Sequence, residues 1–334
     1  MHECVAPHHS QLRPLTGRQQ PLADTSFSST VGSGVRDLGA GASASWLAGE
    51  RLFLQHGPIN LIVRAEGEAQ AVDYAYHELC TEFPTWLSEL AAQLPRLRMA
   101  ESKRLAIPEG AVARRMVTAV RATHAEFVTP MAAVAGAVAD HAIALLARHA
   151  GVTRAWVNNG GDIALHLTPS TYVDIAVVPS LQHAGAAASL RIAESTSVRG
   201  IATSGWQGRS QSLGIADAVT VLAASAALAD AAATLIANAV NAQHPHIVRA
   251  PANTLDEDSD LGTREVTVEV GVLDQDTIHR ALKSGQTVAQ DLCARGIINS
   301  AALLLQRSWL SVDGPSENSP AITWLGSDNI GAPN

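Results

Sequence analysis

Hydrophobic and polar residues alternate with a period of two over several short stretches, which is typical of β-strands with one buried face. This alternation covers residues 51–56 and 59–65, on either side of Gly57-Pro58, and predicts a hairpin there. The same pattern predicts strands over residues 153–158, 163–167, 171–178, 189–195 and 264–273. Residues 217–223 are predicted to begin as a strand that leads into a helix.

A second group of segments has apolar residues three and four positions apart, the spacing of an amphipathic helix. Helices are predicted over residues 68–94, 109–123, 130–150, 276–295 and 297–310. Pro84 is expected to divide the first of these in two, and the last is either a helix or a helix followed by a strand. Because strands and helices do not alternate regularly, the pattern favours an α+β fold, with mixed or antiparallel sheets and packed helices, over a doubly wound sheet.

The two ends of the chain lack this periodicity. Residues 1–48 are rich in Ser, Gly, Pro and His, so we expect a disordered tail. Residues 49–312 are expected to form one domain, and 313–334 a loose tail. The first residues also lack the apolar core of a signal peptide, so none is expected.

The second half of the segment 203–240 predicts a helix with almost no polar face. A helix that is apolar on every side is normally buried, yet Asp230 lies in its middle with Thr234 one turn later on the same face. A buried carboxylate is costly unless it is paired or binds a cation. The partner is therefore either a hard cation, which prefers oxygen ligands, or an arginine such as Arg199 or Arg209.

Composition excludes some classes of function. The 334 residues are 47% hydrophobic, which is ordinary for a globular protein, and the net charge is −8. Without a basic run, and with only 4% aromatic residues, the chain is not expected to bind nucleic acid. The three widely spaced cysteines fit a reduced cytoplasmic protein better than a disulfide framework, and the Ala-rich helix around Asp230 argues against a membrane span.

The stretch Asn159-Gly160-Gly161-Asp162 joins two predicted strands. Asn-Gly between strands is a strong hairpin signal, so a purely structural turn is one interpretation. The other is a binding site, because Gly161 exceeds what such a turn needs and consecutive glycines let backbone N–H groups face an anion. In that case Asp162 would meet a ribose hydroxyl or a metal.

Arginines provide further anion-binding candidates. Arg209 is the only cation of the loop 207–214, and it fits either a phosphate contact or a solvent-exposed position. Arg114, Arg115 and Arg121 lie in the predicted helix 109–123, where they fit a solvated face or a phosphate contact.

Three motifs occur in one order: VNNGGDI (157–163), IATSG (201–205) and, after DAVTVLA, ADAAAT (229–234). Together they resemble the ApbE superfamily, whose founding members are Mg²⁺-dependent FAD:protein FMN transferases. The chain resembles still more closely a less studied branch of that superfamily, long regarded as uncharacterised. The segments similar to that branch are 54–65, 130–140, 200–221, 259–262 and 281–305.

The resemblance implies an ApbE-like layered fold and a set of site residues. Asp230 and Thr234 match the magnesium ligands of those transferases. The residues that match flavin-binding positions are Gly136, Asn159, Gly160, Gly161, Asp162, Thr203, Ser204 and Gly205. Arg209 joins them as a candidate phosphate ligand.

The chain also departs from the transferases. Val134 precedes Ala135-Gly136, so the lysine of their Ala-Lys-Gly signature is missing. Their His-x-x-Asp-Pro element is absent between Trp206 and Ala216, which leaves Asp217 as the only acidic residue there that can act as a base.

Two functions remain open at this point. The first is a Mg²⁺-dependent enzyme that uses FAD, either to transfer FMN to a hydroxyl of an acceptor flavoprotein or to hydrolyse FAD to FMN and AMP. The second is a non-catalytic protein of the same fold that binds a flavin or nucleotide, or assists cofactor assembly. A homodimer is one option for its assembly.

Overall fold

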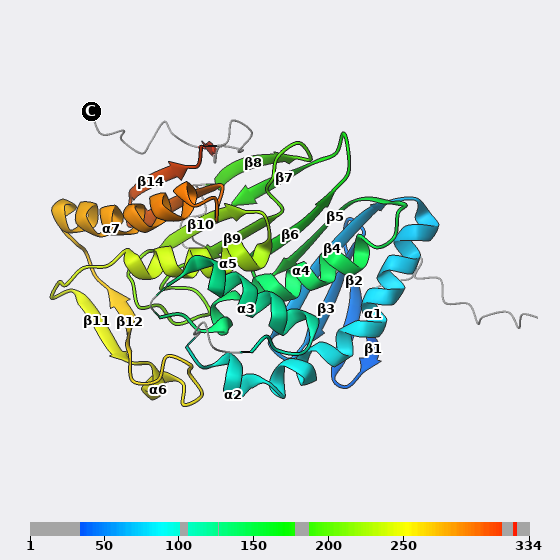
Figure 1. Ribbon diagram of the computed structural model, residues 1–334, viewed down its shortest axis with the longest axis horizontal. Helices are drawn as coiled ribbons and strands as arrows, with labels where there is room; N and C mark the ends of the chain where they lie inside the picture. The colour runs from blue at the N-terminus through cyan, green and yellow to red at the C-terminus, as the bar shows by residue number, and fades with distance from the viewer. Residues whose placement is uncertain (1–33, 101–105, 126, 178–186, 316–322, 326–334) are drawn as a thin grey trace, which may run out of the picture.

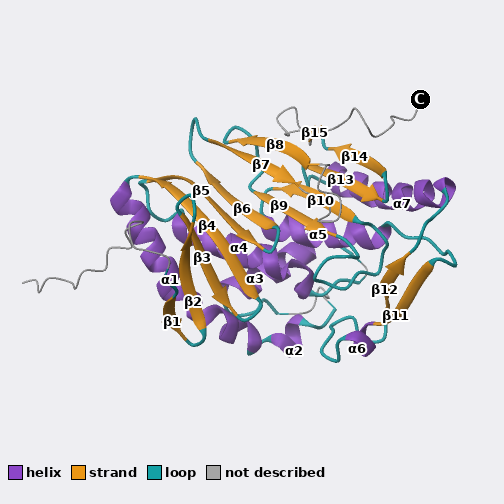
Figure 2. Cartoon of the chain, turned by 180° about the vertical axis from the view of Figure 1, so that it is seen from behind, coloured by secondary structure: helices purple, strands orange, loops and turns teal. Residues whose placement is uncertain are grey.

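The computed structural model describes residues 34–100, 106–125, 127–177, 187–315 and 323–325 and shows an α+β architecture, as the sequence predicts (Figure 1). Its centre is a ten-stranded antiparallel sheet with helices packed on one face, which the view from behind makes plain (Figure 2). The strands of this sheet, in spatial order, are β1 (Arg36–Gly39), β2 (Ala42–Leu47), β3 (Arg51–His56), β4 (Ile59–Gly67), β5 (Val152–Asn159), β6 (Asp162–Leu167), β9 (Gly200–Ser204), β10 (Ala218–Ala223), β13 (Ser300–Leu305) and β14 (Ser308–Asp313).

The remaining strands form two smaller sheets. One consists of β15 (Thr323–Leu325), β8 (Ala187–Ala193) and β7 (Tyr172–Val177), and the other of β11 (Ile247–Pro251) and β12 (Glu265–Val270). An apolar cluster that includes Leu167, Ile192 and Leu222 joins β7 and β8 to the central sheet.

Helices cover the other face of the central sheet. They are α1 (Ala69–Ala91), α2 (Leu94–Leu97), α3 (Ala111–Thr123), the 3₁₀ helix η1 (Pro130–Ala133), α4 (Val134–Leu146), α5 (Ala226–Ala239) and α7 (Gln275–Ala294). The short helix α6 (Ala252–Leu255) instead lies beside β11 of the two-stranded sheet. One apolar core joins α1, α3 and α4 to strands β2 to β5, and a second joins α5 and α7 to β9, β10 and β13. Among the described residues, no helix combines the length and the apolar character needed to cross a membrane.

The predicted alternation accounts for the central strands. Along β4, Ile59, Leu61, Val63 and Ala65 are buried and the residues between them are partly exposed, which confirms the hairpin predicted around Gly57-Pro58. β10 differs because every residue in it is buried. It lies between two neighbouring strands and has apolar clusters on both faces, so its sequence has no polar side.

Several predicted boundaries are wrong. β1 and β2 lie within the predicted disordered tail, and β15 lies within the predicted C-terminal tail. Helix α1 continues through Pro84, because its neighbours Phe83 and Trp86 are buried against the core and hold the segment helical. Residues 300–305 form the strand β13 instead of a helix, since apolar residues on both faces of a central strand look like a helical segment in sequence. The strand β14 that follows agrees with the alternative in which the predicted element ends in a strand.

The helices approach the sheet closely where side chains are absent. A Cβ atom on Gly200, the first residue of β9, would lie 2.0 Å from the backbone carbon of Ser225, just before α5. Helix α5 can therefore begin directly over this strand only because residue 200 is glycine.

The two cysteines in the described part of the chain, Cys80 and Cys293, are free and buried.

We expect Gly200→Ala to lower the free energy of unfolding by about 3 kcal/mol, because the added methyl group meets backbone that can only move together with α5. Urea denaturation would measure this effect. Gly262→Ala is the matched control: it has open space around it but a φ of 59°, so we expect it to cost only about 1 kcal/mol. Equal losses in the two variants would contradict the close approach.

Candidate functional site

The three motifs identified in the sequence meet where four inner strands of the central sheet, β5, β6, β9 and β10, begin or end. Asn159 at the end of β5 pairs with Asp162 at the start of β6. Ile163 of β6 pairs with Ile201 of β9, so Thr203 and Ser204 lie at the same edge. Ser204 in turn pairs with Val219 of β10, which places Asp217 beside them. The sheet register therefore gathers most of the predicted site residues into one region.

The turn between β5 and β6 consists of Gly160 and Gly161 alone, with φ angles of 65° and 118°. A two-residue hairpin of this kind needs positive φ at both positions. The N–H of Gly161 also donates to Asn158 Oδ1 at 2.9 Å. The interpretation that Gly161 exceeds what the turn needs is therefore wrong, because both glycines are required by the hairpin itself.

The turn is nevertheless tied to other predicted site residues. The buried Asn159 donates from Nδ2 to the carbonyl of Ala135, next to Gly136, at 3.0 Å. A Cβ atom on Gly160 would lie 3.6 Å from Arg209 Nη1, so this exposed arginine lies beside the turn. The hairpin thus connects the beginning of α4 with a cation from the loop that follows β9.

Asp230, on α5, is bound to the beginning of α4. The backbone N–H of Gly136 donates to Asp230 Oδ2 at 3.0 Å, and the N–H of Ala135 also contributes to holding the carboxylate. The first N–H groups of a helix lack partners within the helix and lie at the positive end of its dipole. Part of the stabilisation that the buried Asp230 requires is therefore provided by backbone.

Asp140 makes the converse contact from α4. Its two oxygens accept the N–H groups of Ala226 and Ala227, the first residues of α5, at 2.9 Å each. Each helix therefore caps the other with one aspartate. The sequence analysis missed Asp140, although it is an aspartate in an apolar helix, the same signal that identified Asp230.

The helices can cross in this way only if Gly136 has no side chain. A Cβ atom there would lie 2.3 Å from the carbonyl oxygen of Ala226. Gly136 thus has a structural role, whatever ligand the site binds. Gly205 is constrained similarly, since its Cβ atom would lie 2.2 Å from the carbonyl oxygen of Asp217.

Asp162 and Asp230 form a hydrogen-bonded carboxyl pair, and this contact is the main electrostatic feature of the site. Burial raises the pKa of Asp162 well above its usual range, and the charge and hydrogen bond of Asp230 raise it further, against the opposing backbone hydrogen bond of Thr203. Burial also raises the pKa of Asp230 to about 7, against the hydrogen bonds from Gly136 and Asp162. Two carboxyl groups in contact need a shared proton or a cation between them.

The described residues contain no arginine bonded to this pair. Arg199 instead donates to the carbonyl oxygens of Glu194, Thr196 and Val198. Thr234 lies one turn after Asp230 on α5 and is partly exposed. The arginine-paired interpretation of Asp230 is therefore not supported by either of its candidate partners, because Arg209 lies beside Gly160.

The carboxyl pair fits a hard divalent cation. Within the described ranges, no group of three or more His, Cys, Asp or Glu side chains is arranged to hold a metal. Mg²⁺, however, is typically bound by one or two carboxylates and completes its coordination with water and substrate phosphates. Asp162 and Asp230 meet that requirement, which makes Asp162 a stronger candidate ligand than sequence spacing alone indicates.

Asp217 is held by two donors. Trp206 Nε1 donates to Oδ1 at 3.0 Å, and the backbone N–H of Gln306 donates to Oδ2. These contacts fix the loop after β9 onto the turn between β13 and β14, which is a structural role. Thr203 shares a hydrogen bond of 2.9 Å with Thr220 on the neighbouring strand.

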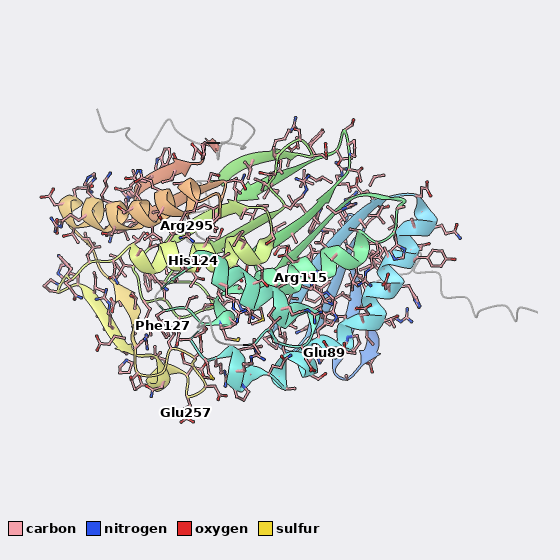
Figure 3. The ribbon with its side chains drawn as sticks, viewed as in Figure 1. Glu89, Arg115, His124, Phe127, Glu257 and Arg295 are labelled. Atoms are coloured by element: carbon pink, nitrogen blue, oxygen red, sulfur yellow. The ribbon has the colours of Figure 1, made fainter. Side chains whose placement is uncertain are left out.

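The segment 252–262, which begins with α6, is fastened by hydrogen bonds to the loop that follows β9. Ser259 donates to Gln211 Oε1 at 2.6 Å, and Gln211 Nε2 donates to the carbonyl of Ala252 at 3.1 Å. Thr129, just before η1, donates to Asp260. Asp260 therefore fastens the segment 252–262 to the residues that lead into η1 and α4, among which Phe127 is labelled in Figure 3.

Comparisons with known proteins assign the chain to a family. A sequence model of a family described as AbpE bacteria matches residues 44–317. UPF0280 proteins of Methanopyrus kandleri and Methanosarcina barkeri are 43% identical over 120 residues and 40% identical over 138 residues, covering 35% and 40% of this chain. These matches cover 46% and 51% of the relatives, so the chain spans about half the length of the curated relatives it matches.

One solved structure is also similar, the apo form of the Pseudomonas stutzeri flavinyl transferase ApbE. The match is 11% identical, covers 84% of this chain and 95% of that chain, and has a TM-score of 0.38. At that level the similarity carries no argument about residues or activity.

The raised pKa values predict how stability depends on pH. In metal-free protein, we expect the free energy of unfolding to fall as the pH rises from about 4 to 7. The ordinary pKa of Asp is 3.8 and that of Asp230 in the fold is about 7, so over this range the unfolded chain releases a proton that the folded protein retains. Urea denaturation in EDTA at several pH values would measure this slope.

Asp162→Asn should make the slope shallower, because an amide can donate to Asp230 without being titrated. Asp258→Asn, at an exposed position, is the control and should leave the slope unchanged. The same slope in Asp162→Asn as in the unmodified protein would contradict a shared proton.

Proposed function

Because the chain belongs to the AbpE bacteria family, we propose that it is a Mg²⁺-dependent enzyme acting on a flavin nucleotide, FAD. The observation that carries the proposal is the Asp162–Asp230 pair, located where the three sequence motifs meet. Burying two carboxyl groups side by side destabilises the fold unless a proton or a cation is bound between them. Groups with such strongly shifted pKa values are common at functional sites.

Each predicted residue has a part in this proposal. Asp162 and Asp230, with Thr234 one turn further, would hold Mg²⁺, which when bound supplies positive charge to the pyrophosphate of FAD. Arg209 beside Gly160 would bind a phosphate oxygen. The edge formed by Asn159, Gly161 and the segment Thr203-Ser204-Gly205 would position the flavin.

The reaction class is phosphoryl transfer. The P–O bond of the FAD pyrophosphate breaks and AMP leaves, while the attacking oxygen forms the new bond to the FMN phosphorus. With a hydroxyl of an acceptor flavoprotein the product is protein-bound FMN, and with water it is free FMN. The attacking hydroxyl or water loses its proton to a base.

Asp217 remains the predicted base, since it is the acidic residue of the loop after β9. To accept a proton, it would have to use a second lone pair of an oxygen that already accepts a hydrogen bond from Trp206 or Gln306, and those two bonds stabilise its charged form. Ala135 stands where the transferases that the chain resembles carry a lysine. These two observations favour the second candidate function, a flavin- or nucleotide-binding protein without turnover.

The proposal extends to context. We place the protein in the cytoplasm with a flavin nucleotide and an acceptor flavoprotein as partners, without nucleic acid or membrane, and with a homodimer as one option. The regions 1–33, 316–322 and 326–334, which include the larger part of both predicted tails, lie outside the described residues.

With FAD and Mg²⁺, we expect AMP to be released, with or without a candidate acceptor, and HPLC would detect it. Asp230→Asn should slow this release by about 100-fold or more, because one charge at the cation site is lost. The control Asp258→Asn should be as active as the unmodified protein. Absence of AMP under all of these conditions would exclude the enzymatic proposal.

Thermal-shift measurements distinguish the two candidate functions. We expect FAD together with Mg²⁺ to raise the Tm more than either alone, since the phosphates complete the coordination of the cation. Stabilisation without AMP release would favour the binding protein. If neither FAD nor FMN raised the Tm at any Mg²⁺ concentration, both proposals would be wrong.

A further inference from the structure

A cavity lies on the helix-covered face, and neither residue of the carboxyl pair lines it. Its volume is about 580 Å³, and it is bounded by α3, the first turn of α5 and the segment before β9. Three arginines line it: Arg114 and Arg115 from α3, and Arg199. Figure 3 shows Arg115 on this face, near the middle of the molecule.

The cavity has an excess of positive charge. Burial lowers the pKa of Arg115, and the charges of Arg114 and Arg148 lower it further, against the attraction of Asp140. The same cations contribute to lowering the pKa of the neighbouring His141 to about 4, for which burial is the main cause. Such an accumulation of like charges is unusual in a chain whose net charge is −8.

The acidic residue at the cavity does not neutralise this charge fully. Both oxygens of Asp140 are occupied by the N–H groups of Ala226 and Ala227, which makes it the cap of α5. Arg148 is compensated by Glu78 at 2.8 Å, and it is not part of the lining. Arg199 is held in place by backbone carbonyls, which fix its position while it retains its charge.

The cavity is separate from the proposed flavin site. Its lining includes neither Asp162 nor Asp230, nor any residue of the β5–β6 turn. Arg199 precedes the first residue of β9, whereas Thr203 and Ser204 lie at the other end of that strand. The two sites therefore lie at opposite ends of β9.

We propose that this cavity binds a small organic phosphate, a phosphomonoester or a diphosphate. Arginine forms paired, charge-assisted hydrogen bonds to phosphate, and Arg114 and Arg115 line the cavity from adjacent positions on α3. The remainder of the lining is largely apolar, including Ile143 and Leu228, and suits the organic part of such a ligand. The volume lies within the usual range for small-molecule sites, roughly 300–1,000 Å³.

Calorimetric titration of the full chain with AMP, pyrophosphate, inorganic phosphate and adenosine tests this proposal. We expect the three phosphates to bind and uncharged adenosine not to bind. Arg114→Gln and Arg115→Gln should each weaken AMP binding by about tenfold or more, because each removes a charge-assisted contact. Arg121→Gln, on the same helix but outside the lining, changes net charge equally and should bind AMP normally.

Asp230→Asn is the control for binding at the proposed flavin site. This variant should retain AMP binding in the cavity even if it loses activity with FAD. Circular dichroism and the Tm would establish that each variant is folded. Failure of all three phosphates to bind, or equal loss of binding in Arg121→Gln and Arg114→Gln, would overturn the proposal. Loss of AMP binding in Asp230→Asn alone would assign AMP to the other site and would also overturn it.

Discussion

The crossing of α4 and α5 is the constraint on which the candidate site depends. Asp140 of α4 caps α5, and Asp230 of α5 accepts N–H groups at the beginning of α4. This exchange fixes both the distance and the orientation of the helices, because an aspartate side chain reaches only a few ångströms. Gly136 makes the approach sterically feasible. Each helix therefore begins where the other provides a carboxylate, and neither end needs water inside the core.

The charge distribution around the crossing follows from this arrangement. The side chain of Asp230 contacts Asp162 at the start of β6, and the side chain of Asp140 lines the cavity with the arginines. The N-terminal ends of two helices bring positive potential to a region that contains three carboxyl groups, which offsets part of their repulsion. What remains is a carboxyl pair that requires a proton or a cation on one side, and an excess of arginine charge on the other. One packing arrangement therefore creates two regions of opposite electrostatic character.

The sequence predicted local features well and their relations less well. Alternation identified β4 and the β5–β6 hairpin, and a buried aspartate in an apolar helix identified Asp230. Pairing of distant strands is not visible in periodicity, so the contact of Asp162 with Asp230 was not predicted. β13 was mistaken for helix because a strand with apolar residues on both faces loses its alternation. The strand β2 was missed because its short residues, such as Ala42 and Ala44, resemble a small-residue tail, and β1 was missed because it has only four residues and none of them is buried.

The burial of Asp230 alone is no longer an argument for a metal. The sequence posed the problem as one carboxylate without a partner, but the backbone of Ala135 and Gly136 provides two donors to it. A single carboxylate capped in this way is an ordinary structural element. The charge that lacks a partner is instead that of the second carboxyl group, Asp162. The register of β6 beside β9 brings this group into contact with Asp230. The hairpin needs Gly160 and Gly161 but does not need an acidic residue next to them. The case for a cation therefore depends on Asp162 as much as on Asp230, and it is the pair that distinguishes a binding site from a capped helix.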